Sequence, residues 1–257
     1  MEITFVCQPF NDDEFAEGLA GLSVIGYKRI ETKDRRIRTF GVDGIGDLLT
    51  KNKMSIIQIN TYFDVVSSDA SAEKSIELNR EMIDYAVKLS VPFIRVFTGP
   101  ITGETIGSDK ATPEIWKRAG STLNKICSEG AKHNISYAVE THHHTLAENT
   151  PSIMKLLEVV DSKNFHVNLQ LPLKGEADVY ESTRILAPFV KHTHLNNFAA
   201  DGHNTFLEEG VIDIRREIDI LRKAGFDGAL SVEHAYHHKP VLMVAKREFE
   251  FLTSIIS

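Results

Sequence analysis

The sequence has few of the residues that stabilise small secreted folds. Its 257 residues include two cysteines, Cys7 and Cys127, and neither has metal-knuckle spacing, which argues against a disulfide scaffold or a thiolate metal site. No apolar run approaches the ~18 residues of a membrane span. The N-terminal segment also lacks the basic and apolar regions of an export signal. We therefore expect a cytoplasmic protein with no membrane partner.

Basic charge is also scarce. The chain has 29 Lys and Arg residues against 36 Asp and Glu residues, and its formal net charge is −7. A protein that binds duplex DNA usually carries a basic surface, so no nucleic-acid partner is expected. The one basic cluster runs from Lys28 to Arg38, and we interpret it as a solvated loop.

Short apolar segments alternate with helical patterns along the chain. Apolar segments cover residues 3–7, 27–30, 55–59, 93–97, 136–139, 166–169, 190–195 and 229–232. Such runs are typical of parallel strands that are buried on both faces. Helical patterns cover residues 12–20, 42–51, 70–89, 112–133, 153–160, 178–187, 214–224 and 240–256.

This alternation predicts an α/β fold. Strand and helix repeat eight times within 257 residues, which matches a single (β/α)8 TIM barrel that spans residues 1–257 as one domain. A doubly wound sheet is the alternative. Such a sheet usually carries a Gly-rich turn after its first strand, and Cys7-Gln8-Pro9-Phe10 is not one.

Most of the predicted strands end in or near a polar residue. In chain order these residues are Gln8, Glu31, Asn60, Arg95, Glu140, Gln170, His194 and Glu233. Active sites of such barrels lie at the C-terminal ends of the strands, so we expect these side chains to converge. The last four combine two carboxylates, an amide oxygen and an imidazole. These donors suit one divalent metal ion, with Mn²⁺ as the first candidate and Mg²⁺, Co²⁺ or Zn²⁺ as alternatives.

Several motifs resemble the xylose isomerase-like barrel superfamily. This superfamily includes sugar epimerases, hydroxypyruvate isomerase, inosose isomerases and dehydratases, 3-dehydroshikimate dehydratases and endonuclease IV. The matching stretches are GYKRIE, FIRVFTG, YAVETHHHTLAENTPSIMKLLEVV, NFHVNLQ, VKHTHLNN and GFDGALSVEH. They extend from the second predicted βα unit to the eighth. The stretch that contains Glu-Thr-His looks most like the dehydroshikimate dehydratase branch.

The resemblance implies a metal-ligand set of Glu, Asp, His and Glu on the fifth to eighth strands. Glu140, His194 and Glu233 match this set, and Gln170 stands where Asp is usual. The glutamine removes one negative charge, so metal affinity should fall and the bound ion should be a stronger Lewis acid. We assign Glu140 as the general base and Glu233 as a ligand that shares the acid/base work, and the reverse assignment stays open.

The resemblance implies a divalent-metal-dependent isomerase or epimerase. Its substrate would be a sugar or a sugar-like polyhydroxy carbonyl compound, converted through a metal-stabilised enediolate. The alternative is a metal-dependent dehydratase, or lyase, of a cyclic keto-acid such as 3-dehydroshikimate, or of an inosose. Leu173 and Ala200 stand near the positions of a substrate-holding His and Arg of the epimerases, which weighs against a strict ketohexose 3-epimerase.

Four further residues are candidates for substrate binding: His142, His192, Arg95 and Glu31. His142 and His192 alternate onto the faces of Glu140 and His194. Arg95 is expected to pair with an anionic substrate group or with Glu140. Glu31 is expected to bind a sugar hydroxyl or to fix the barrel mouth.

The remaining predictions concern two histidines, two other functions and the expected partners. His237 and His238 are expected on the loop after the last strand. A nuclease of the endonuclease IV type and a non-catalytic barrel disarmed by Gln170 are the remaining hypotheses. The expected partner is a small carbohydrate-like molecule. A homodimer is a candidate assembly by analogy with other barrels.

Overall fold

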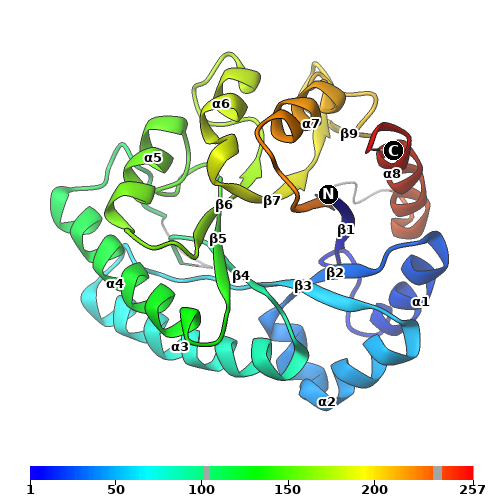
Figure 1. Cartoon of the computed structure of the whole chain (residues 1–257), viewed down its shortest axis with the longest axis horizontal. Helices are drawn as coiled ribbons and strands as arrows, with labels where there is room; N and C mark the ends of the chain where they lie inside the picture. Colours follow the sequence, from blue (N-terminus) through cyan, green and yellow to red (C-terminus); the bar gives the residue numbers. More distant parts are fainter. Residues whose placement is uncertain (101–104, 234–238, 257) are drawn as a thin grey trace.

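Eight parallel strands close into a barrel in the computed structural model (Figure 1). The structure describes residues 1–100, 105–233 and 239–256. The barrel strands are β1 (Glu2–Val6), β2 (Arg29–Lys33), β3 (Ser55–Asn60), β4 (Phe93–Val96), β5 (Ser136–Glu140), β6 (Phe165–Gln170), β7 (Val190–Leu195) and β10 (Ala229–Val232). Each strand pairs with its neighbours in this series, and β10 closes the ring on β1. The predicted (β/α)8 TIM barrel is therefore confirmed.

Helices surround the strands (Figure 1). They are α1 (Phe15–Ile25), α2 (Asp34–Asn52), α3 (Asp69–Leu89), α4 (Pro113–Ala131), α5 (Thr150–Val159), α6 (Val179–Leu186), α7 (Ile214–Lys223) and α8 (Val241–Ile256). Local chemistry fixes several of their starts, because Ser68 and Asn149 form capping boxes before α3 and α5. No helix in the described part of the chain combines the length and the apolar character needed to cross a bilayer.

The loop after β7 carries structure that the sequence patterns did not predict. Strands β8 (Asn197–Phe198) and β9 (Asn204–Thr205) pair in antiparallel fashion in this loop. A short 3₁₀ helix, η1 (Ala187–Phe189), connects α6 to β7. Elements of two or three residues are too short for a periodic pattern to be detected in the sequence.

The basic segment between residues 28 and 38 is not a solvated loop, and that prediction was wrong. Strand β2 and the first turn of α2 occupy it. Arg36 is buried, and its Nη1 donates to the carbonyl of Cys7 at 2.7 Å. A guanidinium has five donors, so backbone carbonyls can satisfy it inside a fold. The predicted helix over 42–51 is only the second part of α2, because Gly41 interrupts the helical backbone with a φ of 72°.

The interior of the barrel contains a polar layer. Glu31 on β2 is hydrogen-bonded to His192 on β7, although β1 and β10 lie between these strands in the ring. The contact must therefore cross the barrel interior. Other buried polar residues are Thr4, Gln58, Asn168 and Ser231. This layer lies next to the residues that the sequence assigned to the site.

Candidate active site

Three of the four predicted metal ligands lie together at the end of the barrel. Glu140 ends β5, His194 lies near the end of β7, and Glu233 follows β10. One ligand atom from each lies within 4.8 Å of the others. Nδ1 of His194 is 3.2 Å from Oε1 of Glu140 and 3.9 Å from Oε1 of Glu233. Two carboxylates and an imidazole thus face a common space, which is a donor set for a divalent cation.

Gln170, the last residue of β6, lies beside this group. Its Nε2 donates to Oε2 of Glu233 at 2.5 Å, and its buried Oε1 has no hydrogen-bond partner among the residues that the structure describes. The two ends of a carboxamide exchange by a half-turn about its last bond. An amide oxygen turned toward Glu233 would be repelled unless a cation lay between the two oxygens. The orphaned oxygen and the donor types therefore fit a divalent cation held by Glu140, Gln170, His194 and Glu233.

Arg95 is committed to Glu140. Its guanidinium is buried, and Nη1 donates to Oε2 of Glu140 at 2.5 Å, while Nη2 donates to the carbonyl of Thr61 at 3.2 Å. Burial by itself raises the pKa of Glu140, but Arg95 and His194 outweigh burial, and the pKa falls to about 2. The carboxylate of Glu140 is therefore ionised and fixed. Of the two partners expected for Arg95, the structure contains the internal carboxylate.

Glu233 has a different environment from Glu140. Its side chain is 23% exposed, and Oε2 accepts hydrogen bonds from the neutral amides of Gln170 and Asn196. Burial raises the pKa of Glu233; His194 opposes this shift, and Glu140 adds to it. The surroundings push the pKa values of the two carboxyl groups apart, an arrangement that divides acid and base roles in enzymes.

Glu31 and His192 lie below His194 and have no exposed surface. Both oxygens of Glu31 are engaged: Oε1 lies 2.6 Å from Nε2 of His192, and Oε2 lies 2.9 Å from Nε2 of His194. The sequence placed Glu31 after a strand that ended at residue 30. The strand instead runs to Lys33, so Glu31 sits within β2 and deeper in the barrel.

Glu31, His192 and His194 form a second cluster with metal-binding residue types, which the sequence analysis did not identify. His194 belongs to both clusters, and each ring nitrogen faces a different one. The alternation of His192 and His194 on one strand was the available signal. Burial of the His194 ring by itself lowers its pKa, but Glu31 and Glu140 raise the pKa well above 6.5.

His142 lies at the rim. A cavity of about 440 Å³ adjoins Gln170, and its lining residues are Thr141, His142, His143, Gln170, Leu171, Pro172, Asn196 and Phe198. The exposed ring of His142 packs against Phe97 with 5.1 Å between ring centroids. The cavity therefore brings one predicted substrate contact, His142, next to one predicted ligand, Gln170. His237 and His238 lie outside the described residues.

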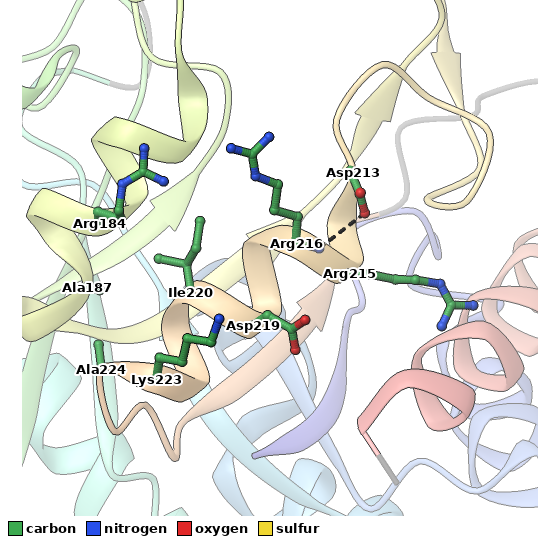
Figure 2. A pocket seen from close by; sticks show the side chains of 9 residues that line it. All are labelled: Arg184, Ala187, Asp213, Arg215, Arg216, Asp219, Ile220, Lys223 and Ala224. Carbon is green, nitrogen blue, oxygen red and sulfur yellow. Dashed lines mark hydrogen bonds between the residues drawn. The ribbon is translucent and has the colours of Figure 1, made fainter.

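A larger hollow lies away from these residues. It has a volume of about 670 Å³ and lies along α7, with Arg184, Arg216 and Lys223 among its lining residues (Figure 2). Figure 2 shows these side chains on the helical layer of the barrel. None of the predicted site residues lines this hollow. The candidate active site is therefore the polar cluster at the strand ends and its adjoining cavity.

Comparisons with known proteins agree with this architecture. A family model described as xylose isomerase-like TIM barrel matches residues 19–255. A 3-dehydroshikimate dehydratase of Bacillus anthracis is 31% identical over 226 residues, which cover 80% of this chain and 77% of that protein.

The solved structures that share this fold include two with TM-scores of about 0.8. One is a probable 3-dehydroshikimate dehydratase involved in petrobactin synthesis from Bacillus anthracis, with 24% identity, a TM-score of 0.80 and coverage of 98% of this chain and 99% of that chain. The other is a D-allulose 3-epimerase from Methylomonas sp. in complex with D-allulose, with 15% identity, a TM-score of 0.81 and coverage of 99% and 97%. At these identities the two likenesses establish the barrel fold alone.

Proposed function

Because the chain belongs to the xylose isomerase-like TIM barrel family, we propose that it is a divalent-metal-dependent enzyme acting on a polyhydroxy carbonyl compound. The observation that carries this proposal is the convergence of Glu140, His194 and Glu233 beside the unpartnered oxygen of Gln170. When bound, a divalent cation would supply Lewis-acid polarisation of a carbonyl.

The proposed reaction is the dehydration of a cyclic keto-acid such as 3-dehydroshikimate. The support is the 31% identity to a 3-dehydroshikimate dehydratase over 80% of the chain. A 3-epimerase is less well supported, since Leu173 is an apolar, buried side chain near the position where epimerases place a substrate-holding His. Isomerisation or epimerisation of a sugar, the first expectation from the sequence, becomes the competing outcome of the assay.

Of the two assignments that the sequence left open, we prefer Glu233 as the base to Glu140. Glu140 is held by Arg95 at 2.5 Å, so its carboxylate is a fixed anion. Glu233 is partly exposed, and within the described residues its Oε2 accepts hydrogen bonds from the neutral amides of Gln170 and Asn196. A base must be able to approach the proton that it removes. Glu233 would take a proton from the carbon next to the carbonyl and return it to the hydroxyl that leaves from the adjacent carbon, so that a C=C bond forms and one water molecule is released.

His142 is the proposed substrate contact on the cavity side. It lines the cavity together with Gln170, and its ring is exposed. An imidazole in this position can donate a hydrogen bond to a hydroxyl or a carboxylate of the substrate. Glu31 and His192 have no surface for this purpose.

The experiment combines metal analysis with an ultraviolet assay. The dialysed protein should contain about one divalent ion per chain after incubation with Mn²⁺. With 3-dehydroshikimate it should generate the absorbance of a conjugated product, and EDTA should abolish the signal. Glu233→Gln should reduce kcat by about 10²–10⁴-fold, because a general base contributes that much. The matched control is Glu217→Gln, which changes a buried glutamate of α7 and should retain activity.

Each outcome has a defined meaning. Failure to bind Mn²⁺ would refute the metal site and the enzyme proposal with it. Metal binding without a new chromophore, together with interconversion of a ketose, would refute the dehydratase and favour the isomerase or epimerase. Full activity of Glu233→Gln would refute its role as the base.

A further inference from the structure

We propose that Glu31 is a positioning residue for His194. By holding a proton on Nε2 of His194, Glu31 leaves Nδ1 as the nitrogen that faces Glu140 and Glu233. The role would make Glu31 part of the metal site without direct contact to the ion or the substrate. This inference rests on the metal site of the proposed function.

The direction of the His194 ring follows from its two contacts. Oε2 of Glu31 lies 2.9 Å from Nε2, and an ionised carboxylate only accepts hydrogen bonds, so Nε2 must carry the proton. Nδ1, on the other side of the ring, lies 3.2 Å from Oε1 of Glu140. In the absence of a cation, a proton on Nδ1 bridges this gap. A cation bound to Glu140 and Glu233 would replace that proton, while the Nε2 contact stays unchanged.

Glu31 is itself immobilised. His192 donates to its Oε1 at 2.6 Å, and Gln58 donates from Nε2 to its Oε2 at 3.0 Å. All three residues are fully buried, at 0% exposure. A buried carboxylate is tolerated only where donors surround it, and these donors come from β3 and β7. The carboxylate therefore has no second position to adopt, and the His194 ring inherits its fixed orientation.

Asn168 agrees with this proton assignment. Its Nδ2 lies 3.0 Å from Nε2 of His194, and its buried Oδ1 has no hydrogen-bond partner in the described part of the chain. Two donors cannot satisfy each other. A half-turn of the amide places the oxygen against the Nε2 proton and removes the orphaned acceptor. Asn168 then acts as a second acceptor for the same N–H.

A second metal ion is the competing interpretation, because Glu31, His192 and His194 also form a metal-binding combination. The hydrogen bonds argue against it. The amide of Gln58 donates its N–H to Oε2 of Glu31, so a cation bound to that oxygen would be repelled by the positive end of the N–H dipole. Glu31 already accepts two further hydrogen bonds, from His192 and His194. We therefore expect one ion per chain.

The test uses Glu31→Gln and Zn²⁺ as the probe. Long-range ¹H–¹⁵N correlation spectra of the histidine rings should show a slowly exchanging Nε2–H of His194 in both the zinc-free and zinc-loaded wild type. The variant His194→Gln identifies that signal. In Glu31→Gln the signal should be lost or exchange rapidly. Calorimetry should show zinc affinity about 10–100-fold lower, the usual loss when the partner of a ligating histidine is removed.

The matched control is again Glu217→Gln, which changes a buried glutamate that lies outside the site. It should keep both the His194 signal and the zinc affinity, and circular dichroism should show that both variants are folded. An unchanged His194 signal and wild-type zinc affinity in Glu31→Gln would overturn the proposal. Two zinc ions in the wild type and one in Glu31→Gln would also overturn it, because Glu31 would then be a ligand.

Failure of the proposed function has a separate signature. If the wild type binds no zinc but the Nε2–H signal still depends on Glu31, the positioning contact stands and the metal site falls. If zinc binds normally and the signal is independent of Glu31, the metal site stands and the positioning role falls.

Discussion

Replacement of Gln170 by glutamate tests the charge of the proposed metal site. The substitution keeps the length of the side chain and adds one negative charge beside Glu233, whose Oε2 lies 2.5 Å from Nε2 of Gln170. Without a cation, two carboxylates ~3 Å apart at an effective dielectric constant of ~20 repel each other by about 5 kcal/mol. A shared proton relieves part of this repulsion at neutral pH. We therefore expect Gln170→Glu to be less stable than wild type in EDTA.

A divalent cation should reverse this effect. The added carboxylate becomes a ligand, and affinity for hard cations rises with the number of charged ligands. Binding of Mn²⁺ should be at least about tenfold tighter in the variant, which corresponds to about 1.4 kcal/mol. The shift in Tm between EDTA and saturating Mn²⁺ should therefore be larger for Gln170→Glu than for wild type. Calorimetric titration with Mn²⁺ measures the affinity directly.

The control is Asn134→Asp, because Asn134 is exposed in the segment before β5 and therefore lies at the opposite end of the barrel from the strand ends. It should leave both the Tm shift and the Mn²⁺ affinity unchanged. Equal affinity in Gln170→Glu and wild type would refute a position of Gln170 next to the cation. A similar gain in Asn134→Asp would mean that the effect comes from net charge and not from ligation.

Three further predictions concern buried charges. Burial raises the pKa of Glu217 from 4.5 to about 8, so the folded wild type holds a proton that the unfolded chain releases. Between pH 4.5 and pH 8 the wild type should therefore lose about 1.4 kcal/mol of stability per pH unit, and Glu217→Gln should become increasingly stabilising relative to it in urea unfolding. Parallel pH profiles of the two proteins would contradict this. Arg95→Met should cost about 3–5 kcal/mol, because the buried carboxylate of Glu140 loses its guanidinium partner. Added Mn²⁺ should raise the Tm of this variant more than that of the wild type. An equal rise in both proteins would argue against a metal site that includes Glu140. Arg36→Met should cost about 2–4 kcal/mol in urea unfolding, because it removes the donor of two backbone carbonyls between β1 and α1. A loss below about 1 kcal/mol would show that these carbonyls find other partners.

The barrel could be predicted because its evidence is local. A parallel strand covered on both faces needs a short apolar run, and each of the eight predicted runs overlaps a barrel strand. The Thr112-Pro113 start of α4 depends on a few adjacent residues in the same way. Motif order along the chain likewise identified the family. None of these inferences needs to know which residues meet in space.

Strand boundaries were less predictable where polar residues face the barrel interior. A polar residue after an apolar run normally marks the end of a strand, so Glu31 was assigned to a strand end. The structure continues β2 to Lys33, since His192 and Gln58 supply donors to Glu31 inside the barrel. Those donors come from other strands, and no pattern around Glu31 contains them.

Local residue patterns are sufficient to predict the repeat of strand and helix, and they include the residue types for a candidate metal site at the strand ends. The arrangement of these residues depends on the closed barrel. It pairs Arg95 with Glu140, leaves Glu233 partly open, and sets Glu31 below His194. Glu31 and His194 are 163 residues apart in the chain. Closure of the barrel brings such residues within hydrogen-bonding distance, and this long-range contact leaves no trace in local periodicity.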